Sequence, residues 1–386
     1  MKVSPHLLPV IVFSQFCCTS LWFAGNAVLK DLIISYDLDQ YALGHLTSAV
    51  QFGFITGTFL FALLSIADRF MASRVFFICA VMGALFNLGL VWEQNSYSIL
   101  IVFRYLTGFF LAGIYPVGMK IASDHFDKGL GKSLGFLVGA LVLGTAFPHF
   151  LKSVATDVSW ELVIYFISGL TLMGGFLILL FIPKGPYSSK GSGFRFSAFL
   201  SVFKNKTFRS AAFGYFGHMW ELYAFWAFVP VMLSTYSIMY PSSSINVSVW
   251  SFIIISIGGL SCVLGGYLSE YLGTKKVASF ALGLSGLCCV ACPFIFQLNE
   301  TSYFLAFLVL WGMAVIADSP LFSSMVAKNA PLKYKGTALT IVNCFGFAIT
   351  ILSIQLMTYA LALTSNVAIY MLLALGPVVG LYKLWK

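Results

Sequence analysis

The sequence has few charged residues and no hydrophilic stretch long enough to form a soluble domain. Only 9% of its 386 residues are Asp, Glu, Lys or Arg, and 60% are hydrophobic, whereas soluble domains carry about 25% charged residues. The sequence also lacks a glycine-rich loop with the lysine of an ATP-binding site. No soluble catalytic pattern is present. These absences argue against a soluble enzyme, and we expect no cofactor.

The cysteines and the N-terminal segment indicate neither a disulfide-bonded protein nor a cleaved signal peptide. All eight cysteines fall inside apolar stretches, which excludes a disulfide framework. Cys288, Cys289 and Cys292 form a compact CCxxC, but no His or carboxylate lies nearby in the sequence. We therefore interpret them as small hydrophobic residues and expect no metal site. The N-terminal apolar run is too long for a signal peptide and has no small-residue cleavage pattern, so it is expected to be a membrane span.

What the sequence does have is a series of about twelve apolar stretches. Each approaches the roughly 20 residues that a helix needs to cross a bilayer. Backbone groups in lipid must be satisfied within their own segment, so these stretches must be helices. They centre near Phe16, Gly53, Gly83, Leu111, Val142, Leu170, Tyr223, Ile257, Gly286, Met313, Ile349 and Ala374. The predicted fold class is an all-α membrane protein.

The basic residues predict the orientation of these helices. The net charge is +9, but the charges sit in short loops rather than in one stripe, so no nucleic acid partner is expected. Of the 22 Lys and Arg residues, Lys30 and Lys152 fall on one side and Arg104 and Lys120 inside spans. The others lie in the opposite loops and the termini. Both termini are therefore predicted to be cytoplasmic, in a bacterial inner membrane.

The two halves of the chain repeat one another. Asp68 and Glu270 end the second and eighth spans at an offset of 202 residues, and Pro116 and Pro320 are offset by 204. Gly144 and Gly346 are also offset by 202. Two parallel repeats of this kind are typical of transporters whose halves rock about a central site. We expect an N-terminal six-helix bundle (1–184), a cytoplasmic linker with a surface helix (185–207) and a C-terminal six-helix bundle (208–386).

Several motifs resemble those of the major facilitator superfamily. The clearest is Gly266-Tyr-Leu-Ser-Glu270-Tyr-Leu-Gly273-Thr-Lys275-Lys276, which resembles the family loop G-x-L-x-D-R-x-G-R-K. The first-half copy keeps Asp68-Arg69 but has Leu64 and Met71 where glycine is usual. Arg104 followed by Gly108 resembles the fourth-helix motif, and the series Gly135, Gly139, Gly144 and Pro148 is similar to the glycine-rich fifth helix. The resemblance covers nearly the whole chain and implies two pseudo-symmetric six-helix bundles. Segments 114–120 and 217–223 resemble bacterial permeases loosely grouped with nitrate and cyanate porters.

Ionisable residues inside the spans are the candidates for coupling transport to protons, since charges at this depth are costly unless they have a function. Glu221 and His218 lie one turn apart in the seventh span, so they share a face and could exchange a proton. Asp318 precedes Pro320 in the tenth span. Arg104, in the fourth span, needs a substrate anion or a carboxylate such as Glu221. For each residue the alternative is a structural contact. For Glu221 it is a hydrogen bond between helices, with the carboxyl group neutral or paired to Arg104; for Arg104 it is a permanent ion pair, and for Asp318 a helix cap.

Polar and aromatic residues on the expected cavity helices are the candidates for binding substrate. Lys120 is either an inner-gate or substrate-anion group, or it pairs with Asp124 at i+4. Any single aromatic residue can equally be packing in the core. The predicted substrate-binding residues are Gln15, Trp22, Asn26, Gln51, Arg104, Tyr115, Lys120, Trp220, Tyr223, Trp226 and Asn343.

Charged residues in the two signature loops are the candidates for a gate. The predicted gate residues are Asp68, Arg69, Arg74, Glu270 and Lys275. By the family resemblance, Asp68 would meet the start of the eleventh helix and hold the outward-facing state. The alternative for each is an ordinary loop charge.

Together these features predict a secondary transporter. We expect a monomer that moves a small polar solute, anionic or zwitterionic, across the lipid bilayer by alternating access, coupled to protons. The alternatives are a siderophore transporter, a multidrug efflux pump and a membrane sensor that binds without transporting.

Overall fold

The structure is a computed structural model that describes residues 6–126, 130–154, 159–188, 202–330 and 335–386, and every regular element in these ranges is helical. Eleven helical segments in the described part are long and apolar enough to cross a membrane, and a shorter apolar helix precedes them. The predicted all-helical membrane fold with about twelve spans is confirmed.

The chain divides into two compact units, residues 1–39 with 49–196 and residues 40–48 with 197–386. The segment 40–48, which the sequence placed in the first bundle, thus groups with the second. Its Gly44 contacts Thr358, and Ser48 accepts a hydrogen bond from the Gln355 amide at 2.8 Å. The predicted surface helix in the linker lies mostly outside the described residues.

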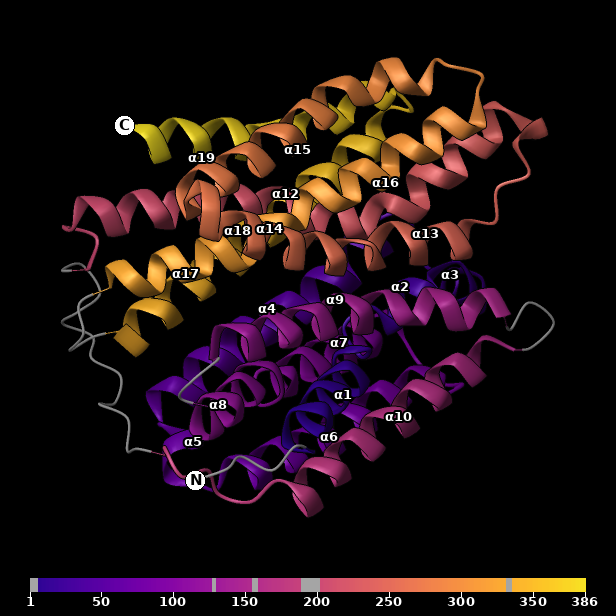
Figure 1. Cartoon of the computed structure of the whole chain (residues 1–386). Helices are drawn as coiled ribbons and strands as arrows, with labels where there is room; N and C mark the ends of the chain where they lie inside the picture. The colour runs from indigo at the N-terminus through magenta and orange to yellow at the C-terminus, as the bar shows by residue number, and fades with distance from the viewer. Residues whose placement is uncertain (1–5, 127–129, 155–158, 189–201, 331–334) are drawn as a thin grey trace. The chain divides into compact units, whose positions relative to one another are not determined.

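The N-terminal unit is a bundle of interrupted and continuous helices (Figure 1), in which α10 lies alongside both α6 and α1. Its elements are α1 (Leu7–Thr19), α2 (Ala24–Ala27), α3 (Leu29–Tyr36), α4 (Ala42–Leu63), α5 (Ile66–Arg69), α6 (Ala72–Leu88), η1 (Gly89–Val91), α7 (Tyr97–Leu111), α8 (Tyr115–His125), α9 (Leu130–Val154) and α10 (Trp160–Phe181).

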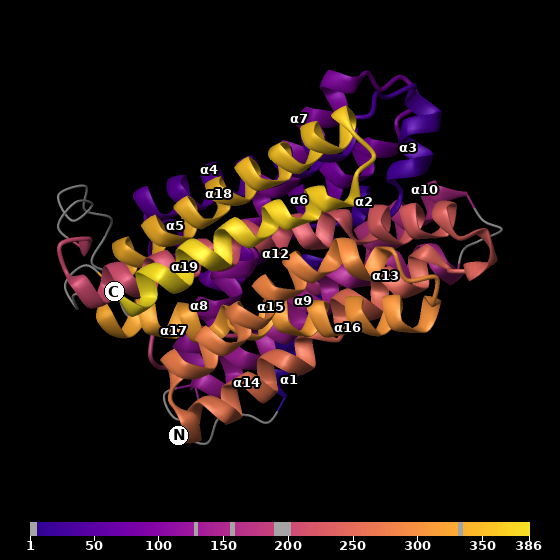
Figure 2. The same cartoon turned by 90° about the horizontal axis from the view of Figure 1, so that it is seen from above.

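The C-terminal unit is built around its longest helix, α12, which is flanked by α18 and α19 (Figure 2). Its elements are α12 (Lys206–Met239), η2 (Pro241–Ser243), α13 (Val247–Ser256), α14 (Gly258–Leu272), α15 (Thr274–Phe296), α16 (Thr301–Ala317), α17 (Ser319–Asn329), α18 (Lys335–Leu363), η4 (Val367–Ala374) and α19 (Leu375–Trp385).

Glycines set the same helix crossing in both units. A Cβ on Gly108 of α7 would strike the carbonyl oxygen of Val50 in α4, and a Cβ on Gly312 of α16 would strike that of Ile254 in α13. Both partners of the second contact lie 204 residues after those of the first. Small residues let membrane helices approach until their backbones touch. The repeat seen in the sequence is therefore also a repeat of tertiary contacts.

The fourth and tenth spans are each interrupted just before a proline. The fourth is divided between α7 and α8, where Pro116 follows the break, and the tenth between α16 and α17 at Asp318, with Pro320 after it. Proline cannot donate the backbone hydrogen bond that would continue a helix. The breaks put polar backbone groups inside each bundle at matching positions of the repeat. In the C-terminal bundle the break also carries the buried Asp318 side chain.

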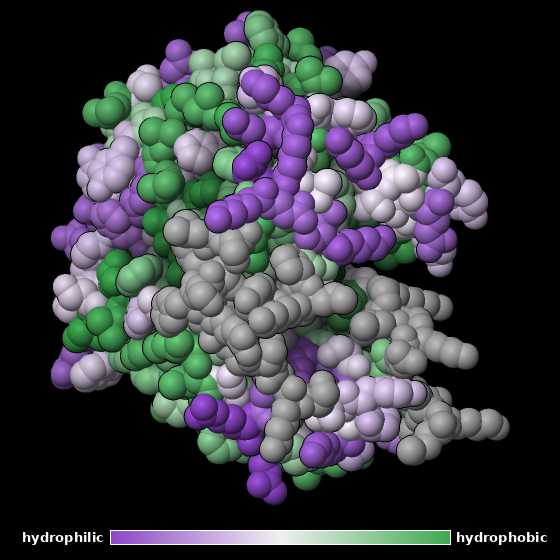
Figure 3. Space-filling model, turned by 90° about the vertical axis from the view of Figure 1, so that its left-hand side faces the viewer, coloured by the Kyte–Doolittle hydropathy of each residue, from purple (hydrophilic) through white to green (hydrophobic). Residues whose placement is uncertain are grey.

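The surface of the helices is mostly apolar, as a lipid-facing surface must be. Large residues such as Leu260, Leu264 and Phe280 are more than half exposed. Figure 3 faces the end of the C-terminal unit where α19 finishes, and there hydrophilic side chains gather among hydrophobic ones. Polar ends and apolar sides are the pattern expected of membrane-spanning helices.

Candidate functional site

Arg104 is a fully buried cation at the centre of the N-terminal unit. The first span breaks at residues 20–23, between α1 and α2, and Arg104 binds the backbone there. Its guanidinium donates from Nη1 to the Leu21 carbonyl at 3.3 Å and from Nη2 to the Trp22 carbonyl at 2.6 Å. In the described part of this unit no carboxylate lies within ion-pair distance of Arg104. The positive charge is thus held by carbonyl dipoles without a counter-charge from its own bundle.

Polar groups predicted to bind substrate surround this break. The Trp22 ring lies 4.7 Å from that of Phe54, one turn after Gln51 on α4. Gln51 and Gln15 are fully buried, and neither amide forms a hydrogen bond with the described residues. Buried amides without partners are costly, because they lose the hydrogen bonds that water gave them. Their free amides and the Arg104 cation are what a polar ligand would need.

Lys120 lies at the end of the N-terminal unit, between two carboxylates. Its ammonium is 3.3 Å from Asp124 and 3.3 Å from Asp68. The contact with Asp124 is the i+4 pair that the sequence offered as an alternative. The break between α7 and α8 separates Lys120 from Arg104 along the fourth span. In this structure Lys120 therefore belongs with the gate residue Asp68.

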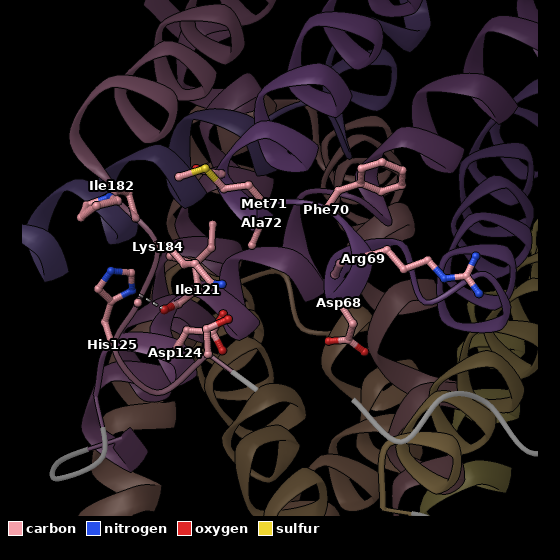
Figure 4. Close-up of a pocket in the computed structure, with 15 residues that line it drawn as sticks. Asp68, Arg69, Phe70, Met71, Ala72, Ile121, Asp124, His125, Ile182 and Lys184 are labelled. Carbon is pink, nitrogen blue, oxygen red and sulfur yellow. Dashed lines mark hydrogen bonds between the residues drawn. The ribbon is translucent and has the colours of Figure 1, made fainter. Parts of the chain in front are cut away.

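A cavity of about 310 Å³ lies beside this cluster in the N-terminal unit (Figure 4). Asp68, Asp124 and His125 contribute to its wall, whereas the Arg69 side chain extends away from Asp124. His125 Nδ1 lies 2.9 Å from the Ile121 carbonyl, which can only accept, so this nitrogen carries the proton. Its wall also includes apolar residues such as Met71 and Ile182, so the cavity is mixed in character, and it adjoins the loop that carries the predicted gate residues.

His218 and Asp318 form a buried pair in the C-terminal unit. His218 Nδ1 on α12 lies 2.7 Å from Asp318 Oδ1 at the α16–α17 break, and both side chains are 0% exposed. The sequence suggested proton exchange between His218 and Glu221, but the nearest carboxylate to His218 is that of Asp318. The helix break explains this, because it turns Asp318 towards α12. An imidazole and a carboxylate at this distance can share one proton.

Glu221 has different partners, one turn along α12. Its Oε1 accepts from Trp311 Nε1 at 2.6 Å and from the Cys289 thiol at 3.3 Å, and its Oε2 accepts from the Ser285 hydroxyl at 2.8 Å. Helices α15 and α16 supply these donors. No carboxylate lies near the CCxxC cysteines in the sequence, but the fold brings Glu221 of α12 to Cys289. Among the described residues, no group of His, Cys, Asp and Glu could hold a metal ion.

Aromatic residues of the seventh span are divided between packing and polar contacts. Tyr223 lies 5.3 Å from Trp226 and 5.2 Å from Phe347, ring to ring, so these rings pack together. Trp220 donates to the Leu372 carbonyl at 3.1 Å. Asn343 of α18 accepts from the Tyr215 hydroxyl at 3.1 Å. Asn26 and Tyr115 are half-buried at the broken first and fourth spans.

The remaining gate candidates lie at exposed helix ends. Arg69, Arg74 and Glu270 are exposed, and the Lys275 ammonium stands 4.4 Å from the Trp385 ring. Gly273 of the second signature loop adopts a φ of 91°, which a residue with a side chain rarely adopts. In the first loop the left-handed residue is Ser65 rather than position 71, which explains why Met71 is tolerated there.

Trp311, Ser285, Cys289 and Tyr215 were not among the predicted site residues. Ser285 and Cys289 are spaced i, i+4 in an apolar helix, which places a hydroxyl and a thiol on one face. That spacing was a usable signal. Trp311 and Tyr215 gave none, since aromatic residues make up 17% of the chain.

The family model of the Major Facilitator Superfamily matches residues 11–354 of this chain. A curated relative, an uncharacterized transporter from Buchnera aphidicola subsp. Baizongia pistaciae (strain Bp), is 29% identical over 120 residues. That match covers 31% of this chain and only 27% of the relative's length.

Two solved structures have the same fold. One is the nucleoside transporter NupG, with a TM-score of 0.74 and 16% identity over 98% of both chains. The other is a bacterial homolog of the human lysosomal transporter Spinster in an inward-facing and unoccupied conformation, with a TM-score of 0.70 and 16% identity over 98% of this chain and 94% of that chain. At this identity the likeness shows the fold alone. The family match, which spans most of the sequence, shows that this chain belongs to the major facilitator superfamily, a family of multi-pass membrane transporters and not of enzymes.

Proposed function

We propose that this protein transports a small anionic or zwitterionic organic solute and couples that transport to protons by alternating access. The observation that carries the proposal is the unequal division of buried charge. Among its described residues the N-terminal unit offers the buried Arg104 no carboxylate partner, and the C-terminal unit buries the His218–Asp318 pair and Glu221. An anion site and a proton site would then be contributed by different bundles.

Arg104 is the proposed binding group for the anionic part of the solute. Burying a cation without a counter-ion costs on the order of several kcal/mol, and a bound anion would offset this cost. The guanidinium keeps N–H groups beyond the two that bind the Leu21 and Trp22 carbonyls, and its Nε has no hydrogen bond with the described residues. Gln15, Gln51 and Trp22 would complete this part of the site. The resemblance to nitrate- and cyanate-porter-like permeases supports an anionic solute.

His218 and Asp318 are the proposed proton site. Together they can gain and lose one proton while remaining buried, which is what coupling requires. Glu221 stays in the proposed coupling set because it lies within electrostatic reach of Asp318. Its three donors hold it in one orientation, so we assign it the role of a fixed charge rather than a carrier.

Asp68 and Lys120 are proposed to form the inner gate. The distribution of loop charges supports a cytoplasmic position for this gate and for both termini, in a bacterial inner membrane. A move of the loop that carries Asp68 would exchange its contact with Lys120 for another, which is the kind of small electrostatic step that a rocking transporter needs.

The first experiment is a thermal-shift screen of the purified protein against organic acids, amino acids and siderophores, followed by uptake in proteoliposomes. Asp318→Asn and His218→Gln should abolish accumulation driven by a proton gradient but keep counterflow, whereas Glu93→Gln, an exposed loop control, should keep both. Accumulation that survives Asp318→Asn would refute the proton site.

The same assay separates the alternatives. Arg104→Ala should abolish transport of an anion or a siderophore polycarboxylate, but it should spare efflux of a lipophilic cation. A sensor would bind its ligand and show no counterflow at all.

A further inference from the structure

We propose that Tyr215 and Asn343 form a lid that controls the access of protons to the His218–Asp318 pair. This inference rests on the proposed function, since it takes that pair as the proton site. It adds two positioning residues that act on His218 without carrying the proton themselves.

His218 Nε2 is the atom that such a lid must cover. Nδ1 lies 2.7 Å from Asp318 Oδ1, so this side of the ring is occupied by the carboxylate. The lone pair of Nε2 is then left to accept a proton from water. Nε2 has no hydrogen bond with the described residues and is buried. Uptake of one proton at Nε2 gives an imidazolium that faces the aspartate, and its release restores the neutral ring.

The neighbours of the ring indicate where water can reach it. Tyr215 lies 6.1 Å and Phe322 6.3 Å from His218, ring centre to ring centre. Phe322 is 0% exposed and contacts Gly214, whereas Tyr215 is 8% exposed. Of these two neighbours of His218, Tyr215 is the less buried.

No other charged group competes near Tyr215 in the contacts that the structure describes. Glu221 of α12 is held by α15 and α16, and Cys262 of α14 lies near Asp318 and donates to the Ile316 carbonyl at 3.3 Å. Control of Nε2 is thus left to the tyrosine.

The lid is held on α18 by one hydrogen bond and one glycine. The Tyr215 hydroxyl donates to Asn343 Oδ1 at 3.1 Å. Asn343 is half-buried, which brings the hydroxyl towards the less buried part of the bundle. A Cβ on Gly346 would lie 2.5 Å from Tyr215 Cε1, so only a glycine lets the ring lie against α18. A shift of α18 along α12 would therefore move the ring away from His218.

The lid can be tested without knowing the solute. Proteoliposomes loaded with a pH-sensitive dye would report proton leak driven by a potassium diffusion potential. Tyr215→Phe keeps the ring but removes the hydroxyl, and Asn343→Leu removes the acceptor. Each should raise the leak about fivefold, the change in open population that follows from the loss of one neutral hydrogen bond. The double variant should leak no more than either single one.

Tyr236→Phe is the matched control. It removes from the same helix a hydroxyl that donates to the Leu298 carbonyl at 2.8 Å, away from His218, and should leave the leak unchanged. Adding Asp318→Asn to Tyr215→Phe should abolish the extra leak. A leak that is unchanged in both lid variants, or that persists with Asp318→Asn, would overturn the inference.

A second measurement separates the lid from the proton assignment. Diethyl pyrocarbonate acylates neutral imidazole, and mass spectrometry would follow its reaction at His218 relative to exposed His6 in nanodiscs. Labelling of His218 should rise about fivefold in Tyr215→Phe and Asn343→Leu. Unchanged labelling contradicts the lid. Increased labelling without a proton leak contradicts the coupling role of the pair, and with it the coupling in the proposed function.

Discussion

Replacing Trp311 by Phe should reveal how strongly Glu221 is tied to its bundle. The indole Nε1 donates to Glu221 Oε1 at 2.6 Å in a fully buried position. Hydrogen bonds to a charged group contribute about 1.5–3 kcal/mol, and this one is short. The Trp311 ring also packs 4.6 Å from that of Phe225 and 5.7 Å from that of Phe307, and a Phe ring would keep only part of this packing. The packing loss must therefore be separated from the hydrogen bond.

A double-mutant cycle makes that separation. Trp311→Phe and Glu221→Leu, whose side chain cannot accept a hydrogen bond, would be measured singly and together by reversible unfolding in detergent. The packing loss is common to both backgrounds and cancels, so the coupling energy should be about 1–3 kcal/mol. Ser285→Ala in the same cycle should give a smaller coupling, since its hydroxyl also bonds the Leu282 carbonyl. A Trp311–Glu221 coupling near zero would refute the view that Glu221 is fixed.

Three other substitutions test the scaffold and the N-terminal site. Gly312→Ala should lower the free energy of unfolding by about 1–3 kcal/mol or prevent folding, because its Cβ would meet the Ile254 carbonyl. Gly139→Ala, which has open space at its Cβ, is the control. It should leave the monodisperse peak in size-exclusion chromatography unchanged. Lys120→Met should lower the free energy of unfolding by about 1 kcal/mol or less at low salt, because the ion pairs it removes are partly exposed. The difference should shrink in 1 M salt, where the Debye length is roughly 3 Å. Arg104→Lys should lower unfolding free energy by about 1.5–3 kcal/mol without any solute, because an ammonium cannot bind both carbonyls of the first-span break as the guanidinium does.

The sequence was enough to predict the spans, because lipid imposes a strict rule on backbone hydrogen bonds. Pro116 and Pro320 are local signals for the breaks that the structure has before them, because proline cannot donate the backbone hydrogen bond that continues a helix. The break in the first span could not be predicted. Residues 20–23 contain neither proline nor glycine, and their carbonyls are bound by Arg104, more than 80 residues away.

The candidate charges could be found from the sequence, but their partners could not. A lone carboxylate in an apolar span is visible without a structure. Which donor faces it depends on the rotation of neighbouring helices, which hydropathy does not encode. Thus Glu221 and His218, one turn apart, were expected to act together, yet α16 gives Glu221 a tryptophan and the α16–α17 break gives His218 an aspartate.

The matched glycine crossings have a consequence for how this protein diverged. Leu308 occupies in α16 the place that Arg104 occupies in α7, and Ile114 occupies the place of Asp318, each 204 residues apart. The close helix crossing is thus the same in both repeats, whereas the buried ionisable residue at these positions is an arginine in the first repeat and an aspartate in the second. Exchanging Arg104 with Leu308 and Ile114 with Asp318 would test whether the positive and negative sites can swap bundles while the helix crossings stay the same.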